Sequence, residues 1–273
     1  MTATQYEIAA RDSAELVLSL GGINKRFGAV QALTDVSLDV HAGEVVALVG
    51  DNGAGKSTLV KTIAGVYQPD SGSIQLGGQQ VAITTPSAAQ HLGIATVFQD
   101  LALCDNLDVV ANLFLGKEHH RGTLMNEVTM EKEAWRLLRT LSAKIPSVRI
   151  PVASLSGGQR QTVAIARSLV GAPRVVMLDE PTAALGVAQT AEVLNLVERL
   201  RENGLAVILV SHNMADVQAV SDRIVVLRLG RNAAEFHTED VTADQLVAAI
   251  TGASDNVVAQ RAARRSPTGE ETE

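Results

Sequence analysis

The chain has 273 residues, a formal net charge of −7 at pH 7 and a hydrophobic content of 46%, with only 3% aromatic residues. This hydrophobic content is enough to build a packed core, so the composition excludes an intrinsically disordered chain. The acidic balance argues against a broad nucleic-acid-binding face, because phosphate backbones require clustered Lys and Arg. One cysteine, Cys104, cannot form an intramolecular disulfide, and a reducing compartment is the expectation.

The ends of the chain differ from its middle. Residues 1–13 are predicted to form a flexible leader and residues 253–273 a polar, disordered tail, around one domain over residues 14–252. No apolar run approaches the roughly 18–20 residues that a membrane-spanning helix needs. A membrane role is therefore expected only through a partner.

At the start of the domain, Glu15–Leu20 and Ala32–Val40 have the apolar pattern of strands.

The stretch Val45–Gly65 contains a strand, a glycine-rich turn and a helix in succession. Its turn fits G-x-x-x-x-G-K-[ST] and comprises Gly50, Asp51, Asn52, Gly53, Ala54, Gly55, Lys56, Ser57 and the following Thr58. Glycines let backbone N–H groups surround a phosphate, and the helix N-terminus adds more. Lys56 is placed to reach the β- and γ-phosphates, and the Ser57 hydroxyl to ligate Mg²⁺. The alternative is a chance glycine turn, but the flanking strand and helix favour nucleoside triphosphate binding.

The next segment is predicted to add a small antiparallel pair, Ser73–Leu76 and Val81–Ile83, and an apolar strand, Ile94–Phe98, that ends at Gln99. Residues from about 100 to 165 differ in kind, because their apolar residues recur at helical spacing. They are predicted to form an inserted helical subdomain. Within it, His119 and His120 are expected in a solvated loop, and the lone Cys104 supports neither a metal site nor a catalytic thiol.

A second anion-binding element is predicted at Leu155-Ser156-Gly157-Gly158-Gln159, where a serine and two glycines open a helix that runs through Val170. The plain alternative is a capping box, with Ser156 as N-cap and Gln159 three residues later. Both interpretations can hold, because a well-capped helix start also presents N–H groups. Two phosphate-binding helix starts in one chain are unexpected unless the second serves another molecule.

Two further apolar strands end in polar residues: Arg174–Leu178 runs into Asp179-Glu180, and Leu205–Val210 into Ser211-His212. Helices are predicted over Val187–Asn203, Met214–Val220 and Ala243–Ile250, with strands at Ile224–Leu229 and Ala233–Phe236. In a doubly wound sheet, ligands bind beyond the carboxyl ends of the strands. The phosphate loop, Gln99, Asp179, Glu180 and His212 are therefore expected to converge on one γ-phosphate.

The strand-end residues have the chemistry of phosphoryl transfer. Asp179 follows a buried strand, as the magnesium-binding acid of P-loop NTPases does, and the alternative is an acid that caps a turn. Glu180 is placed to orient or deprotonate the attacking water, and the alternative is a surface acid. His212 could donate to the γ-phosphate. Gln99 could contact Mg²⁺ or the water, although polar residues at strand ends are common.

These motifs, together with Phe27, stand in the order and context of the ATP-binding cassette (ABC) ATPases, which the chain resembles from about Leu16 to Gly252. The resemblance implies an α/β P-loop NTPase fold with a mainly parallel core sheet flanked by helices, an antiparallel β subdomain and an inserted helical subdomain. It implies MgATP binding, and a head-to-tail dimer in which each phosphate loop faces the partner's Leu155–Gln159 element. Phe27 would stack on adenine; the alternative is an aromatic that packs on the sheet.

The resemblance extends to a subgroup. The strings DEPTAALGV and VFQDLALCDNL are similar to those of single-cassette ATPases of bacterial simple-sugar importers. This implies integral membrane permease subunits as partners, an extracytoplasmic solute-binding protein, a place at the cytoplasmic face of the membrane, and Leu101–Leu115 near the surface that engages the permease. A homodimer is the simpler expectation. One departure is Gly186, where many cassettes have aspartate, so contacts made by that carboxylate are in doubt.

Other functions stay open from the residues alone. An ABC transporter for amino acids or for export fits the same physics, and the sugar itself is not encoded in this chain. A soluble ABC protein acting on ribosomes or DNA is disfavoured, because the chain has a single phosphate loop, no sustained heptads and an acidic balance. An ATP-binding regulator without hydrolysis is disfavoured by Asp179, Glu180 and His212 and kept open by Gly186.

Overall fold

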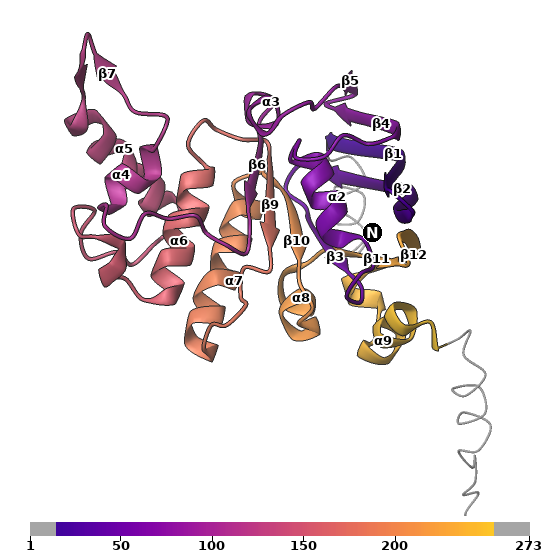
Figure 1. Cartoon of the computed structure of the whole chain (residues 1–273). Coiled ribbons are helices and arrows are strands. Elements are labelled where there is room, and N and C mark those ends of the chain that lie inside the picture. The colour runs from indigo at the N-terminus through magenta and orange to yellow at the C-terminus, as the bar shows by residue number, and fades with distance from the viewer. Residues whose placement is uncertain (1–14, 254–273) are drawn as a thin grey trace, which may run out of the picture.

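The computed structural model describes residues 15–253, and the predicted leader and most of the predicted tail lie outside them. A six-stranded sheet runs through the centre, in the order β12-β11-β3-β10-β9-β6 (Figure 1). Its members are β3 (Val45–Val49), β6 (Ile94–Val97), β9 (Val175–Asp179), β10 (Ala206–Val210), β11 (Arg223–Arg228) and β12 (Arg231–His237). All pairings are parallel except that of β11 with β12. The predicted mainly parallel core sheet is confirmed.

Alternate residues of the core strands face opposite layers. In β9, Val176 and Leu178 pack with helices α6 (Gly157–Ser168) and α7 (Val187–Glu202), whereas Val175 and Met177 face helix α2 (Lys56–Ile63). Both sets are fully buried, which explains why the strand is a continuous apolar run rather than an alternating one. The two-sided burial fixes the register of the sheet, since a one-residue slip would exchange the two faces.

A separate antiparallel sheet covers the α2 side of the core, with strand order β2-β1-β4-β5. Its strands are β1 (Leu16–Phe27), β2 (Val30–His41), β4 (Ser71–Leu76) and β5 (Gln79–Val81). The antiparallel β subdomain is thus confirmed, but β1 is longer than its predicted extent, and β5 lies at Gln79–Val81 rather than at the predicted Val81–Ile83. Register shifts between Leu20 and Ile23 break the alternation of apolar residues there, and the strand continues beyond them.

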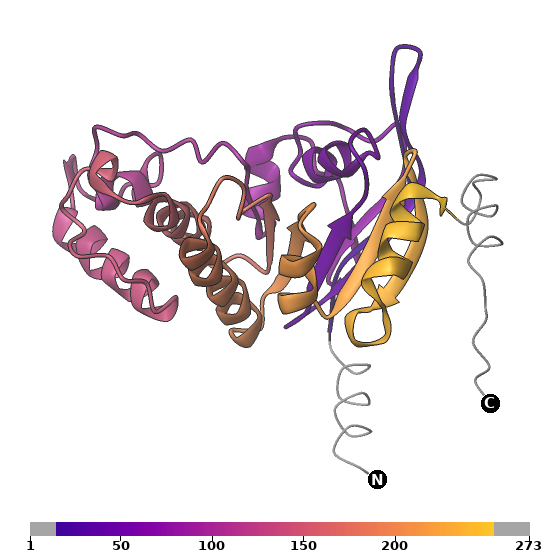
Figure 2. The ribbon, with the colours of Figure 1, turned by 90° about the horizontal axis from the view of Figure 1, so that it is seen from below.

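The predicted helical insertion lies on the opposite side of the core sheet from the antiparallel sheet (Figures 1 and 2). It contains α4 (Val109–Phe114), α5 (Glu127–Thr140) and α6. The expectation that Lys117–Arg121 forms a solvated loop is wrong in part, because a short hairpin, β7 (His120–Arg121) with β8 (Leu124–Met125), stands there. His119 also packs edge-on against Phe114, with ring centroids 5.3 Å apart.

The remaining elements complete the layers. They are α3 (Pro86–His91), α8 (Met214–Val220), α9 (Ala243–Thr251), and the 3₁₀ helices η1 (Val152–Ser154) and η2 (Thr238–Asp240). Helix α8 matches its predicted bounds, and α7 buries Val193, Val197 and Leu200 on one side as its spacing predicts. Helices α8 and α9 pack near β3 and β11 through Val217 and Leu246. This packing holds the strand that precedes the phosphate loop.

Candidate active site

The four strands whose ends carry the predicted site residues are consecutive neighbours in the core sheet, β3-β10-β9-β6 (Figure 1). Their registers align Leu48 with Val210, and Val210 with Asp179. Leu178 is aligned with Val97 on the last strand. The segments that follow these strands therefore leave the sheet from one edge. The structure brings together the phosphate loop, His212, the Asp179-Glu180 pair and the segment at Gln99.

Lys56 holds the phosphate loop from within. Its side chain is 9% exposed, and its Nζ donates to the carbonyl oxygens of Gly50 at 2.6 Å and Asp51 at 3.1 Å. The loop therefore curls around the ammonium group, which supplies positive charge at the start of α2. Ser57, the next residue of the helix, is exposed. Its hydroxyl is open to a ligand from solvent.

Two glycines of the loop lie where no side chain fits. A Cβ on Gly50 would stand 2.2 Å from the carbonyl oxygen of Leu227, and one on Gly55 would stand 2.9 Å from that of Ala32. Gly55 also has φ +105°, in the region that favours glycine. The amide N–H of Gly230 donates to the carbonyl of Ala54 at 3.0 Å and supports the loop from the β11–β12 turn. This tight curl fits a polyanion bound by backbone N–H groups.

The carboxylates of Asp179 and Glu180 stand in different surroundings. Burial raises the pKa of Asp179, the charge of Glu180 raises it further, and Lys61 and Lys56 oppose the rise. Glu180 has φ +52°, so the chain turns sharply after the last residue of β9. Its amide still donates to the carbonyl of Val210 at 2.9 Å, which ties the turn to β10. The two adjacent carboxylates therefore lie in different positions at the end of β9.

Glu180 is paired directly with His212. The Nδ1 atom of His212 lies 2.7 Å from Oε2 of Glu180, and the Glu180 side chain is 16% exposed while the His212 side chain is 74% exposed. Nδ1 is therefore the ring nitrogen that faces the carboxylate. The other nitrogen, Nε2, makes no hydrogen bond to any residue in 15–253. The pair therefore offers a held carboxylate and an accessible imidazole.

One residue that supports the site lies outside the predicted site motifs. Asp216, on α8, is 5% exposed, and its Oδ2 accepts a hydrogen bond of 2.7 Å from Oγ1 of Thr182, two residues after Glu180. The bond anchors the turn that carries Glu180 to the helix after His212. A buried acid in the first turn of a helix is the signal that could have identified it.

The start of α6 is a capping box. The Ser156 hydroxyl accepts from the amide of Gln159 at 3.3 Å, and the Gln159 side chain accepts from the amide of Ser156 at 3.0 Å. Gly157 and Gly158 lie against α7, because a Cβ on Gly158 would stand 3.2 Å from Cβ of Gln189. The capping alternative is confirmed. The side chains of Ser156 and Gln159 accept hydrogen bonds from backbone amides at the start of their own helix. Ser156 is exposed.

Phe27 is the last residue of β1 and is 41% exposed. Its ring meets that of Tyr67 edge-on at 5.0 Å, and Nζ of Lys25 lies 5.5 Å from its centroid. One face of the ring therefore has protein neighbours, and much of the side chain stays open to solvent. Gln99, in the segment after β6, is exposed as well.

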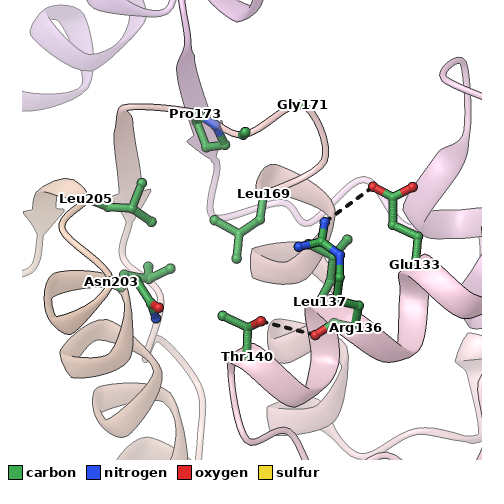
Figure 3. Close-up of a pocket in the computed structure, with 11 residues that line it drawn as sticks. Glu133, Arg136, Leu137, Thr140, Leu169, Gly171, Pro173, Asn203 and Leu205 are labelled. Carbon is green, nitrogen blue, oxygen red and sulfur yellow. Dashed lines mark hydrogen bonds and ion pairs between the residues drawn. The ribbon is translucent and has the colours of Figure 1, made fainter.

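Among the described residues, no group of three or more His, Cys, Asp or Glu could hold a metal ion by itself. The strand ends offer instead a hydroxyl at Ser57 and a carboxylate at Asp179. This donor set suits Mg²⁺, which is held through one or two carboxylates together with phosphates of a substrate. A separate open pocket of about 470 Å³ lies between α5, the end of α7 and the segment before β9 (Figure 3). None of the predicted site residues lines it.

Comparisons with known proteins agree with this architecture. The sequence pattern of the ABC transporter family matches residues 33–183. The xylose/arabinose import ATP-binding protein XylG of Sulfolobus acidocaldarius is 41% identical over 235 residues, which are 86% of this chain and 94% of that protein. The fructose import ATP-binding protein FrcA of Rhizobium meliloti is 42% identical and covers 88% of this chain and 96% of itself.

A longer relative, the ribose import ATP-binding protein RbsA 2 of Rhizobium etli, is 42% identical, but the chain spans only 47% of its length. Among solved structures, the ADP conformation of MJ1267, an ATP-binding cassette of an ABC transporter, is 27% identical with a TM-score of 0.77. That comparison covers 87% of this chain and 99% of MJ1267. The dimeric structure of MJ0796, a bacterial ABC transporter cassette, has a TM-score of 0.69 at 27% identity and covers 81% of this chain and 98% of itself.

The chain belongs to the ABC transporter family, and it is an ATP-binding cassette ATPase of that family. The predicted family and fold class are confirmed. The roles of individual residues remain predictions.

Proposed function

We propose that this chain is the ATP-hydrolysing subunit of a membrane importer for a simple sugar. The observation that carries the proposal is the Glu180–His212 pair at the strand end beside the phosphate loop. It occurs in a chain that aligns along most of its length with import ATP-binding proteins for xylose or arabinose and for fructose. The site supports hydrolysis, and the relatives support the sugar.

The phosphate loop would bind the triphosphate through the backbone N–H groups of residues 50–55 and the start of α2. Lys56 would exchange its contacts to Gly50 and Asp51 for the β- and γ-phosphates, because an ammonium group prefers charged acceptors to carbonyls. Its burial keeps it in place before the substrate arrives. The open side of Phe27 would receive the adenine ring.

A magnesium ion would be held by the Ser57 hydroxyl and the Asp179 carboxylate, with Gln99 at its edge. When bound, Mg²⁺ neutralises charge that develops on the phosphate oxygens. The raised pKa of Asp179 supports this role, since a half-buried carboxylate beside Glu180 is short of positive charge. Ser57 and Gln99 are both exposed and free to turn toward a ligand.

Glu180 would orient the attacking water and accept its proton. The ion-pair contact with Nδ1 of His212 holds the carboxylate, and the Thr182–Asp216 hydrogen bond holds the turn behind it. The low exposure of the Glu180 side chain limits competing contacts with bulk water. His212 would then contact the γ-phosphate from its exposed side. General-base groups of this kind contribute typically ~10²–10⁴-fold to a rate.

The functional unit we propose is a head-to-tail homodimer. The start of α6, from Ser156 to Gln159, would face the triphosphate bound by the partner protomer, so that the second anion-binding element serves another molecule's ligand. The dimeric structure of the cassette MJ0796 supports a dimer. Residues 14–252 would act as one ATPase domain, with residues 100–165 as its helical subdomain.

No helix within residues 15–253 is long and apolar enough to cross a membrane. We assign sugar translocation to integral permease subunits, which this chain would join at the cytoplasmic face, with a solute-binding protein outside. Residues 101–115 of the helical subdomain would lie near the permease. The names of the import relatives support these partners.

The test is uptake of labelled monosaccharides by source cells that lack the gene, complemented with wild type or with Glu180→Gln. Loss of uptake of one or two sugars, rescued by wild type and not by Glu180→Gln, is the expected result. Rescue by both forms would refute the role of Glu180. Unchanged uptake of every sugar in the deletion strain, with uptake of an amino acid lost instead, would refute the sugar assignment.

A further inference from the structure

Arg167 lies near the end of α6, far along the helix from Ser156. Its guanidinium forks onto two successive carbonyl oxygens, with Nη2 2.6 Å from that of Leu101 and Nη1 2.7 Å from that of Ala102. These carbonyls belong to the segment that leaves the core sheet just after Gln99. A single side chain thus joins the helix of the second anion-binding element to the segment that carries Gln99.

The charge of Arg167 has no carboxylate partner within residues 15–253. Burial lowers its pKa, and the nearby Cys104 opposes this only weakly. Lys117, the other cation at this end of α6, donates to the carbonyl of Val170 at 3.0 Å, and burial and the charge of Arg167 lower its pKa. The planar guanidinium donates to both carbonyls in a fixed geometry, so it sets the position of this backbone relative to α6.

The segment held by Arg167 is itself strained. Ala102 has φ +47°, a conformation that residues with a Cβ rarely adopt. Its amide donates to Oδ1 of Asp100 at 3.1 Å, so the turn is clamped from both sides. Leu101 and Leu103 are partly buried against the helical core, and this packing fixes how deeply the segment lies. The conformation of residues 100–102 is therefore imposed by its neighbours, and Gln99 leads directly into it.

We propose that Arg167 is a positioning residue that holds Gln99 at the strand ends and links it to α6. The inference rests on the role proposed above for Gln99. Helix α6 has 12 residues, so at about 1.5 Å per residue it is a rod of roughly 18 Å with Ser156 at one end and Arg167 at the other. Contact of the partner's triphosphate with the first end would thus be conveyed to Gln99 through the second.

The experiment is a double-mutant cycle with Arg167→Lys, Gln99→Ala and the double variant in the full chain. Lysine keeps the positive charge but cannot reproduce the paired hydrogen bonds of the planar guanidinium. We expect Arg167→Lys to lower kcat about tenfold with KM for ATP within about twofold, because the phosphate loop is untouched. If Arg167 acts through Gln99, the double variant is no slower than Gln99→Ala alone. Effects that multiply would overturn the proposal.

Arg160→Lys is the matched control, because Arg160 lies on the same helix and contacts Asp105 and the carbonyl of Ala153 instead. It should leave kcat unchanged. Amide hydrogen exchange over residues 100–104, measured without ATP, should be faster in Arg167→Lys and unchanged in Arg160→Lys. If Arg167→Lys does not fold, Asp100→Ala loosens the same turn and should show the same dependence on Gln99.

The measurements distinguish failure of the proposed ATPase function from failure of the positioning role of Arg167. A wild-type chain that does not hydrolyse ATP would refute the proposed function, whatever the exchange data show. Hydrolysis by the wild type that Gln99→Ala leaves unchanged would refute the role of Gln99 and the positioning role with it. Hydrolysis slowed by Gln99→Ala but not by Arg167→Lys would overturn the inference and leave the proposed function standing.

Discussion

Nδ1 of the His212 imidazole lies 2.7 Å from Oε2 of the Glu180 carboxylate, and the two residues follow neighbouring strands, β10 and β9. The contact joins the ends of two neighbouring strands. Since Glu180 lies at the positive-φ turn and His212 is mostly exposed, the pair combines a fixed carboxylate with an accessible ring. The first prediction tests this pairing.

Replacing His212 by alanine removes the imidazole that contacts Glu180 and leaves the strand in place. We predict a fall in kcat of about 10²-fold with little change in KM for ATP, because general-base geometry is lost and the phosphate loop is not. Steady-state phosphate release measures it. His237→Ala, at an exposed histidine outside the site, is the control and should hydrolyse ATP at the wild-type rate. Equal rates for both variants would contradict a catalytic role for His212.

Asp179→Asn should stabilise the free protein while it abolishes hydrolysis. The pKa of Asp179 is raised by burial and by Glu180, so the native state is destabilised as pH rises above the ordinary range of aspartate. At pH 7 the amide removes that penalty, and we expect Tm to rise by about 1–3 °C without nucleotide. The difference should vanish near pH 3, where the carboxyl is protonated in both states. Asp240→Asn, at an exposed acid, is the control, and a lower Tm for Asp179→Asn at pH 7 would contradict the account.

Arg223→Met tests the partly buried ion pair between Arg223 and Glu44, at the opposite ends of the strands from the site. Burial alone would raise the pKa of Glu44, but hydrogen bonds and charge from Arg223 outweigh it, so the pKa is lowered. The variant should lose about 3 kcal/mol of unfolding free energy at pH 7, because it leaves the partly buried Glu44 carboxylate with contacts to His41 alone. A lowered pKa stabilises the fold above the ordinary range of glutamate and ceases to do so as pH falls through the lowered value.

Urea unfolding at pH 7 and pH 4 should therefore show a smaller difference between wild type and Arg223→Met in acid. Arg174→Met is the control, because the Arg174–Glu15 pair is exposed on both sides and should contribute less than about 1 kcal/mol. A loss that is the same at both pH values would show that Arg223 stabilises the fold by packing rather than by charge.

Gly186 is the N-cap of α7, with φ −76° and ψ 164°, and a Cβ added there would have no neighbouring atom within 4 Å. The site therefore accepts aspartate without strain. We predict that Gly186→Asp raises the unfolding free energy by a few tenths of a kcal/mol and that Gly186→Ala lowers it, since aspartate is a good N-cap and alanine a poor one. Because the wild type hydrolyses ATP without this carboxylate, kcat of Gly186→Asp should stay within about twofold. A reversed order of stability would refute the capping account.

The strand ends can be predicted well from the sequence, because the apolar run of a strand and the motif that follows it are both local features. A buried strand such as Val45–Val49 is a short apolar run, and the motif after it fixes the phosphate loop. That four such runs become neighbours follows from the rules of parallel sheets rather than from any one residue. The structure supplies the order, with β10 between β3 and β9.

The side-chain contacts could not be predicted in the same way. The Glu180–His212 and Thr182–Asp216 pairs join residues 32 and 34 positions apart, and nothing in the local pattern specifies them. The fork of Arg167 onto Leu101 and Ala102 spans 65 positions or more and ends on backbone atoms, which carry no sequence signal at all. Strand β1 exceeds its predicted extent because its register shifts disrupt the alternation that marks a strand.

The most direct test of the central claim is ATP hydrolysis by the purified full chain, compared between wild type and Glu180→Gln with magnesium present. The account predicts steady turnover by the wild type, a loss of about 10²-fold or more in the variant, and ATP binding that is equal in both. A variant that hydrolyses ATP at the wild-type rate would contradict the assignment of Glu180, and with it the active site described at these strand ends.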